Sequence, residues 1–515
     1  MPDPQLIRAE YLIADPDRLG GGVIEDGACV IEDGRVVAVG PWRELEPRYR
    51  GLTPLGDGRD RLAIPGLINA HHHGRGLGTL QTGMVDAPLE LWLPSFLLYP
   101  QVDPYWDTLY AAARMLRSGI TTSLQSHSSG GPMSAFETSV RRALDAYRDA
   151  GVRVAFAIGH YDQKILSYLE DEQFLAHLPP ALRREAERHF ALDQLYIDTD
   201  DYFAFTGALE SERATSYPKA KLLLSPIGLH WASDRLLERT AAAAEHYRMG
   251  VHLHLVETKL QRRYVARRFG EEPMQVLDDF GLSGPQVSVA HAIWSSERDI
   301  ELYAETGTTV VTNTSSNLRL GSGKIPLPEM LDRGVEIAIG TDSMGLFGED
   351  DLLQEMGLLA ALHRGPDRER LWPSPFDALR MATTGGARAA QLEGVVGRLL
   401  PGYRADVTVI DLRRLRAPYL HARADLVALA LAQSRASDVD TVLVEGRVLV
   451  QSGRLTRLDP RQISLELQQS CREAEKGEDE ARAAFLDRLT PWLHNLYHDW
   501  FPGDPDEPTP PHTPR

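Results

Sequence analysis

Cysteine is scarce in this sequence: Cys29 and Cys471 are its only two cysteines, and they stand far apart in a chain of 515 residues. So few cysteines exclude a disulfide framework and any zinc site built on a CxxC pair. The simplest location for such a chain is a reducing compartment, the cytoplasm. If the protein binds a metal, the ligands have to come from histidine and from the carboxylates of aspartate and glutamate.

Long hydrophobic runs are also missing. The most apolar stretches, such as LWLPSFLLYP at 91–100, are short and contain proline. A helix needs about 20 apolar residues to span a bilayer, so we expect no membrane-spanning segment. The opening residues, MPDPQLIRAE, lack the apolar core that a secretory signal requires.

Positive charge is in deficit, because 55 lysines and arginines face 73 acidic residues, which gives a net charge of -18. This balance argues against a nucleic-acid-binding groove and against an anionic membrane surface. We therefore expect neither nucleic acid nor membrane as a partner, while the net charge says little about the small-molecule substrate that the motifs described below imply. The hydrophobic content of 43% and charged content of 25% are ordinary for a soluble globular protein.

The middle of the chain alternates apolar strands with helical stretches that end in glycine. Glycine at a helix C-terminus followed by a buried strand is typical of repeated βα units, and eight such units make an α/β fold, the (β/α)8 TIM barrel. We predict this barrel over residues 63–391. The expected strands lie at 63–73, 119–127, 152–160, 221–230, 250–257, 287–293, 308–316 and 335–342.

Both ends of the chain read as short strands and turns, for example CVIEDGRVVAVG at 29–40 and VDTVLVEGRVLVQSGRL at 439–455. Neither end is large enough to bury a core alone. We expect residues 1–62 and 392–460 to pack together as one small β-sandwich-like domain. Residues 461–501 look like a helical extension with an apolar stripe at Trp492, Leu496 and Trp500, and we expect the proline-rich 502–515 to be disordered.

The connection over 163–219 is long for a barrel loop and contains helical and aromatic stretches. Connections of this length are usually functional or serve packing. It is consistent with a lid over the barrel or with a subunit contact, and the sequence does not distinguish the two.

Metal-ligand residues begin at AIPGLINAHHHGRG, residues 63–76. Side chains alternate along a strand, so His71 and His73 share a face and His72 points the other way. Two imidazoles so placed can bind one metal ion, although histidines at a polar strand end can also simply hydrogen-bond.

Further polar residues follow at the ends of later expected strands: His254 and Glu257 in HLHLVE, His291 in AHAIW, and Asp342 in GTDS. Each has an alternative role in structure alone; Asp342, for example, could cap the following helix. We interpret His252 as a barrel-interior histidine that is satisfied by hydrogen bonds. The joint placement at the ends of strands one, five, six and eight favours a single site, because barrel enzymes keep their active sites at that end.

Together these motifs resemble the amidohydrolase superfamily. PGLINAHHH is similar to its first-strand PGxxxxHxH, HLVE to its fifth-strand HxxE, and GTDS to its eighth-strand aspartate motif. GRLLPGYRADVTVID at 397–411 is similar to the segment that returns the chain to the flanking β-domain. The resemblance extends to about residue 455.

The resemblance implies a role for each matched residue. His71, His73, His254 and Asp342 would bind one divalent metal, zinc with iron or manganese as alternatives, which lowers the pKa of a water enough to supply hydroxide. Asp342 would accept a proton from that water, Glu257 would pass one to the leaving nitrogen, and His291 would stabilise the tetrahedral oxygen. Relatives are often homo-oligomers, dimers or larger, so we expect the same here.

The resemblance also bears on the number of metals. Two-metal members carry a bridging lysine at the end of the fourth strand, and here that end reads SPIGLHWAS, with Lys221 at the strand's start. This arrangement supports one metal.

The subgroup that the chain resembles most contains deaminases and chlorohydrolases of guanine, S-adenosylhomocysteine and triazine type. This resemblance rests on DAPLELWL at 86–93 and SSNLRL at 315–320, which are similar to segments of that subgroup. Arg75 departs from it, because HxHxR is the spacing of dihydroorotases and hydantoinases, in which the arginine binds substrate. The alternative is an arginine that lies at the surface or behind the residues that touch the substrate. His127 stands where many relatives have aspartate. The expected substrate contacts are Arg75, Gln81, Trp92, His127, His160, His230 and Asn317.

Three functions stay open on the sequence. The first is hydrolytic deamination of an amidine-like carbon in an N-heterocycle. The second uses the same site on an amide, urea or carbamate C–N bond, or releases halide as a triazine hydrolase does. The third is a non-catalytic structural relative, which the retention of all four ligands argues against.

Overall fold

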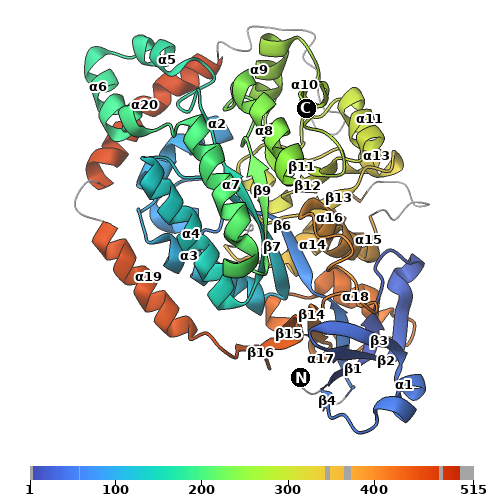
Figure 1. Ribbon diagram of the computed structural model, residues 1–515. Coiled ribbons are helices and arrows are strands. Elements are labelled where there is room, and N and C mark those ends of the chain that lie inside the picture. The colour runs from blue at the N-terminus through green and yellow to red at the C-terminus, as the bar shows by residue number, and fades with distance from the viewer. Residues whose placement is uncertain (1–3, 57, 343–347, 365–372, 475–478, 499–515) are drawn as a thin grey trace.

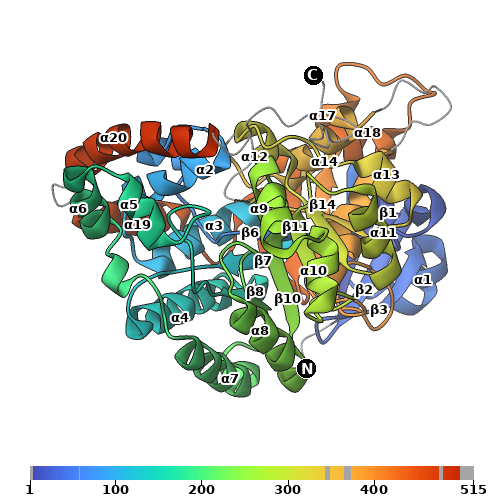
Figure 2. The ribbon, with the colours of Figure 1, turned by 90° about the horizontal axis from the view of Figure 1, so that it is seen from above.

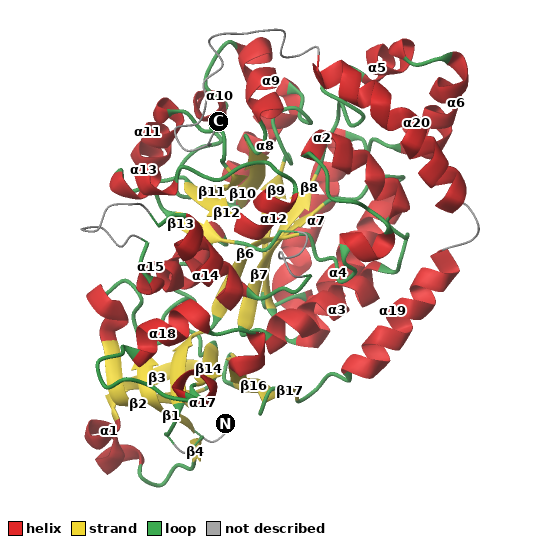
Figure 3. Cartoon of the chain, turned by 180° about the vertical axis from the view of Figure 1, so that it is seen from behind, coloured by secondary structure: helices red, strands yellow, loops and turns green. Residues whose placement is uncertain are grey.

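The computed structural model describes residues 4–56, 58–342, 348–364, 373–474 and 479–498. It contains two sheets, an eight-stranded one surrounded by helices and a nine-stranded one beside it. Figure 3 shows the strands of the second sheet set apart at one end of the molecule. The 502–515 tail, predicted to be disordered, lies outside the described residues.

The eight-stranded sheet is the predicted (β/α)8 barrel. Its strands are parallel neighbours in sequence order, from β6 to β13. The first and last strands meet where the backbone N–H of Asp342 donates to the carbonyl of His71 at 2.9 Å, so the barrel closes at the C-terminal ends of its strands. The strands are β6 (Leu67–His72), β7 (Ile120–His127), β8 (Arg153–Gly159), β9 (Ala220–Ser225), β10 (Gly250–Leu255), β11 (Val287–His291), β12 (Thr309–Thr312) and β13 (Ile337–Ile339).

Helices surround the barrel (Figure 1). Several stop where the sequence predicts: α4 ends at Gly151, whose φ of +81° is the left-handed conformation that terminates a helix. The helices between or after the strands are α3 (Pro104–Arg117), α4 (Met133–Ala150), α7 (Thr199–Ser216), α8 (Asp234–Tyr247), α9 (Lys259–Phe269), α10 (Pro273–Asp279), α11 (Glu297–Thr306), α12 (Thr314–Arg319), α13 (Leu327–Asp332), α14 (Leu352–Leu362), α15 (Pro375–Arg380), π-helical η5 (Met381–Gly385) and α16 (Gly386–Ala389).

The predicted first strand at 63–73 is wrong in one respect, because it is two strands in two sheets. β5 (Arg61–Pro65) pairs with β14 and β1 in the other sheet, and the barrel begins only at Leu67. The break falls at Gly66, where a Cβ atom would lie 2.2 Å from Oγ1 of Thr121. Only glycine permits this close approach, so the chain changes sheets there.

The second sheet joins both ends of the chain in the order β17-β16-β15-β14-β5-β1-β2-β3, with β4 on β1. A buried apolar cluster of residues from both ends, including Leu12 and Val407, holds it together. Short helices flank it: η1 (Leu19–Gly22), α1 (Trp42–Tyr49), α17 (Arg413–Arg416), α18 (Leu426–Gln433) and η6 (Ala436–Asp438). The remaining strands are β1 (Gln5–Ile13), β2 (Val23–Glu32), β3 (Arg35–Pro41), β4 (Pro54–Leu55), β14 (Val407–Asp411), β15 (Val439–Val444), β16 (Arg447–Gln451) and β17 (Arg454–Leu455).

Helices from two segments lie over the C-terminal ends of the barrel strands: α5 (Asp171–His177) and α6 (Pro180–His189) of the 163–219 connection, and α20 (Asp479–His498) near the C-terminus. The connection also forms η4 (Leu192–Gln194) before the barrel helix α7. α19 (Pro460–Ala474) precedes α20, and α20 contacts α6 and α2 (Figure 2). α2 (Leu89–Trp92), η2 (Thr79–Thr82) and η3 (Leu93–Leu98) precede α3.

The buried face of α20 differs from the predicted stripe. The buried side chains are Phe485, Leu486, Leu489, Leu493 and Tyr497, Leu496 is partly buried, and Trp492 is 40% exposed. Trp500 lies outside the described residues. Among the described residues, no helix combines the length and the apolar character needed to cross a bilayer.

Candidate metal and active site

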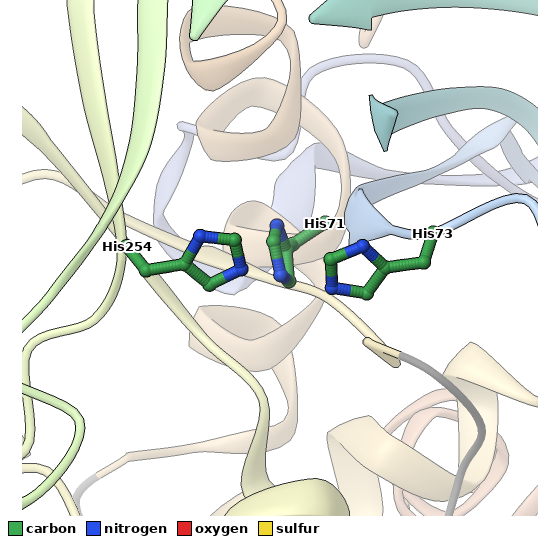
Figure 4. Close-up of side chains that lie close together, drawn as sticks. All are labelled: His71, His73 and His254. Carbon is green, nitrogen blue, oxygen red and sulfur yellow. The ribbon is translucent and has the colours of Figure 1, made fainter. Parts of the chain in front are cut away.

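Three histidines from two strands converge at the catalytic end of the barrel. His71 and His73 come from β6 and the residue after it, and His254 comes from β10. One ring nitrogen of each lies within 4.8 Å of the others. Figure 4 shows the three rings turned toward one another. The side chain of His72 turns away, and its Nε2 lies 3.1 Å from Asp350.

Hydrogen bonds to backbone carbonyls set the protonation of two of these rings. Nδ1 of His73 donates to the carbonyl of Ser126 at 2.9 Å, and Nδ1 of His254 donates to the carbonyl of Ile227 at 2.9 Å. A carbonyl oxygen only accepts, so each neutral ring carries its proton on Nδ1 and keeps a lone pair on Nε2. Both Nε2 atoms are therefore ready to bind a metal.

Burial keeps the rings neutral. Desolvation lowers the pKa of His73, and it lowers the pKa of His71 and His254 well below the ordinary value, with the neighbouring histidines adding to the effect. Nε2 of His71 is buried and has no hydrogen-bond partner among the residues that the structure describes. A buried polar atom without a partner is costly, and a metal ion at this point would satisfy it.

Asp342 lies beside the three histidines and could provide an oxygen ligand. Its Oδ1 lies 3.0 Å from Nε2 of His73 and 3.6 Å from Nε2 of His71. The other oxygen, Oδ2, accepts a hydrogen bond from Oγ of Ser316 at 2.6 Å, which fixes the orientation of the carboxylate. Three imidazoles and one carboxylate are a donor set that suits zinc, iron or manganese, so the residues present fit one divalent cation.

Glu257 and His291 stand beside this ligand set. Oε2 of Glu257 lies 3.5 Å from Nε2 of His291. Burial raises the pKa of Glu257 to about 7, and the negative charges of Asp342 and Glu90 add to the shift while His291 opposes it. A carboxyl group with this pKa can both accept and give a proton near neutral pH.

A short helix contacts both Asp342 and His291. The expected strand at 308–316 ends at Thr312, and α12 (Thr314–Arg319) follows it. α12 places Ser316 on Asp342, and Oδ1 of Asn317 lies 2.9 Å from Nδ1 of His291. The buried carboxylate of Glu355 accepts from the backbone N–H and the hydroxyl of Ser315, which fixes the start of the helix.

Strained backbone marks the strand ends. Ile227, Val256, His291 and Asp342 have φ angles of 58°, 39°, 74° and 58°. Branched side chains rarely adopt this left-handed region, so Ile227 and Val256 are held there by their surroundings. At Ile227 this backbone conformation places the carbonyl oxygen where it accepts the hydrogen bond from Nδ1 of His254.

A cavity of about 640 Å³ opens over the ligand set. Its floor includes His73, His254 and Asp342, and its walls come from α2, η3, α5, α6 and α20. Of the expected substrate contacts, Arg75, Trp92 and His230 line this cavity. The guanidinium of Arg75 stacks on the ring of Phe96 at 4.3 Å.

The other expected substrate contacts lie elsewhere. Gln81 is exposed and accepts the backbone N–H of Gly78 at 3.0 Å, so the structure gives it a capping role in η2. His127 lies between Gln125 and Ser139, and His160 stacks on Tyr202 at 4.5 Å. Asn317 contacts His291 and does not line the cavity.

Several residues of the site were not singled out from the sequence. Ser316 contacts Asp342 and Glu90 lines the cavity; both lie in the segments SSNLRL and DAPLELWL, which resemble the family, but the sequence gives neither residue a role of its own. Leu489 and Tyr497 line the cavity from α20, more than 230 residues after His254 in the sequence. Only the fold brings them to the site.

Comparison with known proteins agrees with this geometry. The model of the amidohydrolase family matches residues 62–449, about three quarters of the chain. The chain belongs to the amidohydrolase family. It is 32% identical to a 5-methylthioadenosine/S-adenosylhomocysteine deaminase from Syntrophobacter fumaroxidans over 467 residues, which cover 90% of this chain and 96% of the relative.

Two solved structures are similar to this amidohydrolase. An adenosine deaminase from Xanthomonas campestris with bound zinc is 26% identical, with a TM-score of 0.75 and coverage of 91% of this chain and 98% of the relative. The zinc complex of an atrazine chlorohydrolase from Arthrobacter aurescens TC1 is 25% identical, with a TM-score of 0.76 and coverage of 90% and 99%. The predicted family and barrel fold are confirmed.

Proposed function

We propose that this amidohydrolase is a zinc-dependent deaminase that removes the exocyclic amino group of an adenosine-type heterocycle as ammonia. The observation that carries the proposal is the convergence of His71, His73, His254 and Asp342 beside a carboxyl group, Glu257, whose pKa is about 7. The likeness to deaminases over nine-tenths of the chain indicates the substrate class.

His71, His73, His254 and Asp342 would hold the zinc ion. Bound there, the ion supplies the Lewis acidity that activates water near neutral pH. The hydrogen bonds from His73 and His254 to backbone carbonyls keep the ligands in place between turnovers. The hydroxyl of Ser316 leaves Oδ1 of Asp342 facing the site by engaging Oδ2.

Glu257 moves the proton that deamination requires. Replacing an amino group by oxygen at a ring carbon needs a proton on the departing nitrogen, since amide ion is too poor a leaving group. The side chain of Glu257 lines the cavity, and its raised pKa leaves it partly protonated at neutral pH. It can therefore take a proton at one stage and deliver it to nitrogen at the next.

His291 faces the same point from β11. Its contact with Asn317 holds the ring, and its Nε2 is directed at Glu257. Because Nδ1–H of His291 donates to Oδ1 of Asn317, an N–H on Nε2 exists only when the ring is protonated at both nitrogens. That Nε2–H would stabilise the negative charge that develops on the oxygen added to the ring carbon.

The cavity suits a nucleoside-sized substrate, because small-molecule pockets usually enclose about 300–1,000 Å³. Trp92 and Leu89 provide apolar surface for a ring system. Glu90 is a buried carboxylate in the cavity wall that accepts hydrogen bonds from Tyr168 and Thr258. A carboxylate there is an acceptor for hydroxyl or amino groups of the substrate.

A second function is favoured by one observation, the likeness to an atrazine chlorohydrolase at 25% identity over 90% of this chain. The same residues would then expel chloride from a triazine ring carbon. Hydrolysis of an amide, urea or carbamate would release an amine instead. The three reactions differ in the product that leaves.

A substrate screen separates these reactions. Purified protein of known zinc content is incubated with adenosine, 5'-deoxyadenosine, 5-methylthioadenosine and S-adenosylhomocysteine, with chlorotriazines, and with ureas and carbamates. Ammonia, chloride and amine are measured separately. The proposal expects ammonia from the adenosine-type compounds. Chloride or amine release without ammonia release would overturn it.

A further inference from the structure

His71 differs from the other two histidine ligands in what holds its Nδ1 atom. Nδ1 of His73 and His254 each face a backbone carbonyl, which accepts only. Nδ1 of His71 instead lies 2.8 Å from Nε2 of His252, another imidazole. A neutral imidazole nitrogen can donate or accept, so this contact alone leaves the proton of His71 on either nitrogen.

The contacts of His252 on its other side decide which of the two histidines donates. Nδ1 of His252 lies 2.8 Å from Oγ of Ser288, and the Ser288 hydroxyl donates to the carbonyl of Ala389 at 3.2 Å. Ala389 is the last residue of α16, where carbonyls have no partner within the helix. Because the hydroxyl gives its single proton to that carbonyl, Ser288 accepts from Nδ1–H of His252. Nε2 of His252 then accepts from Nδ1–H of His71.

The consequence reaches the metal site. With its proton on Nδ1, His71 presents the lone pair of its buried and unsatisfied Nε2 toward His73, His254 and Asp342. If every hydrogen bond ran the other way, His71 would carry its proton on Nε2 and point an N–H at the other metal ligands. The Ser288 hydroxyl would then donate to His252, and the carbonyl of Ala389 would lose its donor. His252 and Ser288 are fully buried, so water does not substitute for either one.

We propose that His252 is a positioning residue for the metal site: the relay from Ala389 through Ser288 and His252 fixes the tautomer and orientation of His71. His252 touches neither the ion nor the substrate, because its two nitrogens are used in the relay. Such outer partners typically contribute 10–100-fold to metal affinity. The proposal concerns the assembled metal site and does not depend on which substrate the enzyme uses.

The test measures zinc affinity without any substrate. Protein is stripped of metal, and its zinc dissociation constant is determined by competition with a chromophoric chelator. His252→Leu removes the acceptor and should weaken zinc binding about 10–100-fold. His252→Gln places a carbonyl oxygen near the position of Nε2, so Gln can accept from His71 and should restore most of the affinity. Ser288→Ala frees the His252 tautomer and should weaken binding by a smaller factor.

A matched control is Thr122→Val on β7. Thr122 is also a buried strand hydroxyl, but it has no hydrogen-bond partner in the described part of the chain, so its removal should leave the zinc dissociation constant unchanged. The d–d absorption spectrum of the cobalt-substituted proteins adds a direct signature of ligand geometry. We expect it to change in His252→Leu and to match the wild type in Thr122→Val.

Two results would overturn the proposal. Zinc binding by His252→Leu and Ser288→Ala as tight as in the wild type would show that the relay does not control His71. Equal loss in His252→Gln and His252→Leu would show that packing of the ring, and not its acceptor atom, matters. If His252→Leu does not fold, the comparison of His252→Gln and Ser288→Ala with Thr122→Val decides.

Discussion

Replacing Glu257 by glutamine should make the metal-free protein more stable at alkaline pH while it removes most of the activity of the zinc-loaded enzyme. Glutamine has nearly the same shape as glutamate, so the packing around residue 257 changes little. The difference is that glutamine is never charged. A buried carboxylate is costly to ionise, and this substitution removes the cost.

The size of the effect follows from the pKa. The pKa of Glu257 is raised from 4.5 to about 7, chiefly by burial. The folded protein therefore binds more protons than the unfolded chain between these two values, and the penalty grows as pH rises through that window. At about 1.4 kcal/mol per unit, the carboxylate lowers the free energy of unfolding by about 3 kcal/mol at pH 8 and by less than about 1 kcal/mol at pH 5.

The assay compares urea unfolding of metal-free wild type and Glu257→Gln at pH 5 and pH 8 in the presence of a chelator. The variant should unfold at higher urea than the wild type at pH 8, with a much smaller gap at pH 5. Glu172→Gln, at an exposed position on α5, is the control and should show no gap at either pH. In the zinc-loaded enzyme the turnover of Glu257→Gln should fall about 10²–10⁴-fold, as expected for loss of general acid–base catalysis.

The reasoning about burial would be refuted by a gap of the same size at both pH values, or by a variant less stable than the wild type at pH 8. Unimpaired turnover at full zinc content would remove Glu257 from proton transfer.

Two other substitutions test the fold and the cavity. Arg153→Leu should lower the free energy of unfolding, measured by urea titration, by about 3–5 kcal/mol. The reason is that Asp406, which is 2% exposed and lies 3.2 Å from the guanidinium, would stay buried without its cation. A change under about 1 kcal/mol would contradict this. Leu489→Trp should raise the KM for the substrate about tenfold, because Leu489 is buried in the cavity wall and added bulk there costs about 1–3 kcal/mol. Trp492→Ala on the exposed side of α20 is its control, and equal effects of both variants in steady-state kinetics would refute the argument.

The barrel and the ligand set could be predicted from the sequence because their signals are local. Strand alternation places His71 and His73 on one face within three residues, and glycine-terminated helices mark the repeating units. In a parallel barrel the C-terminal ends of all strands meet at one end. This rule is enough to bring His254, at the end of β10, and Asp342, after β13, close to His71.

What the sequence did not show depends on contacts between distant segments. The transfer of Arg61–Pro65 to the other sheet follows from the close approach of Gly66 to Thr121, which no local pattern records. His252 looked like a satisfied core histidine, and only the position of the Ser288 hydroxyl gives its hydrogen bond to His71 a direction. The walls of the cavity come from α6 and α20, which the sequence could not place.

The central claim is that one divalent ion is held by residues from β6, β10 and the end of β13, and the most direct test is the metal content of His254→Ala beside that of the wild type. Elemental analysis after gel filtration should find about one zinc, iron or manganese ion per wild-type chain and almost none in the variant. The circular dichroism spectra of the variant and the wild type should be the same, because the fold does not depend on the ion. Equal metal content in both proteins would contradict the account, because it would mean that the ion is held elsewhere.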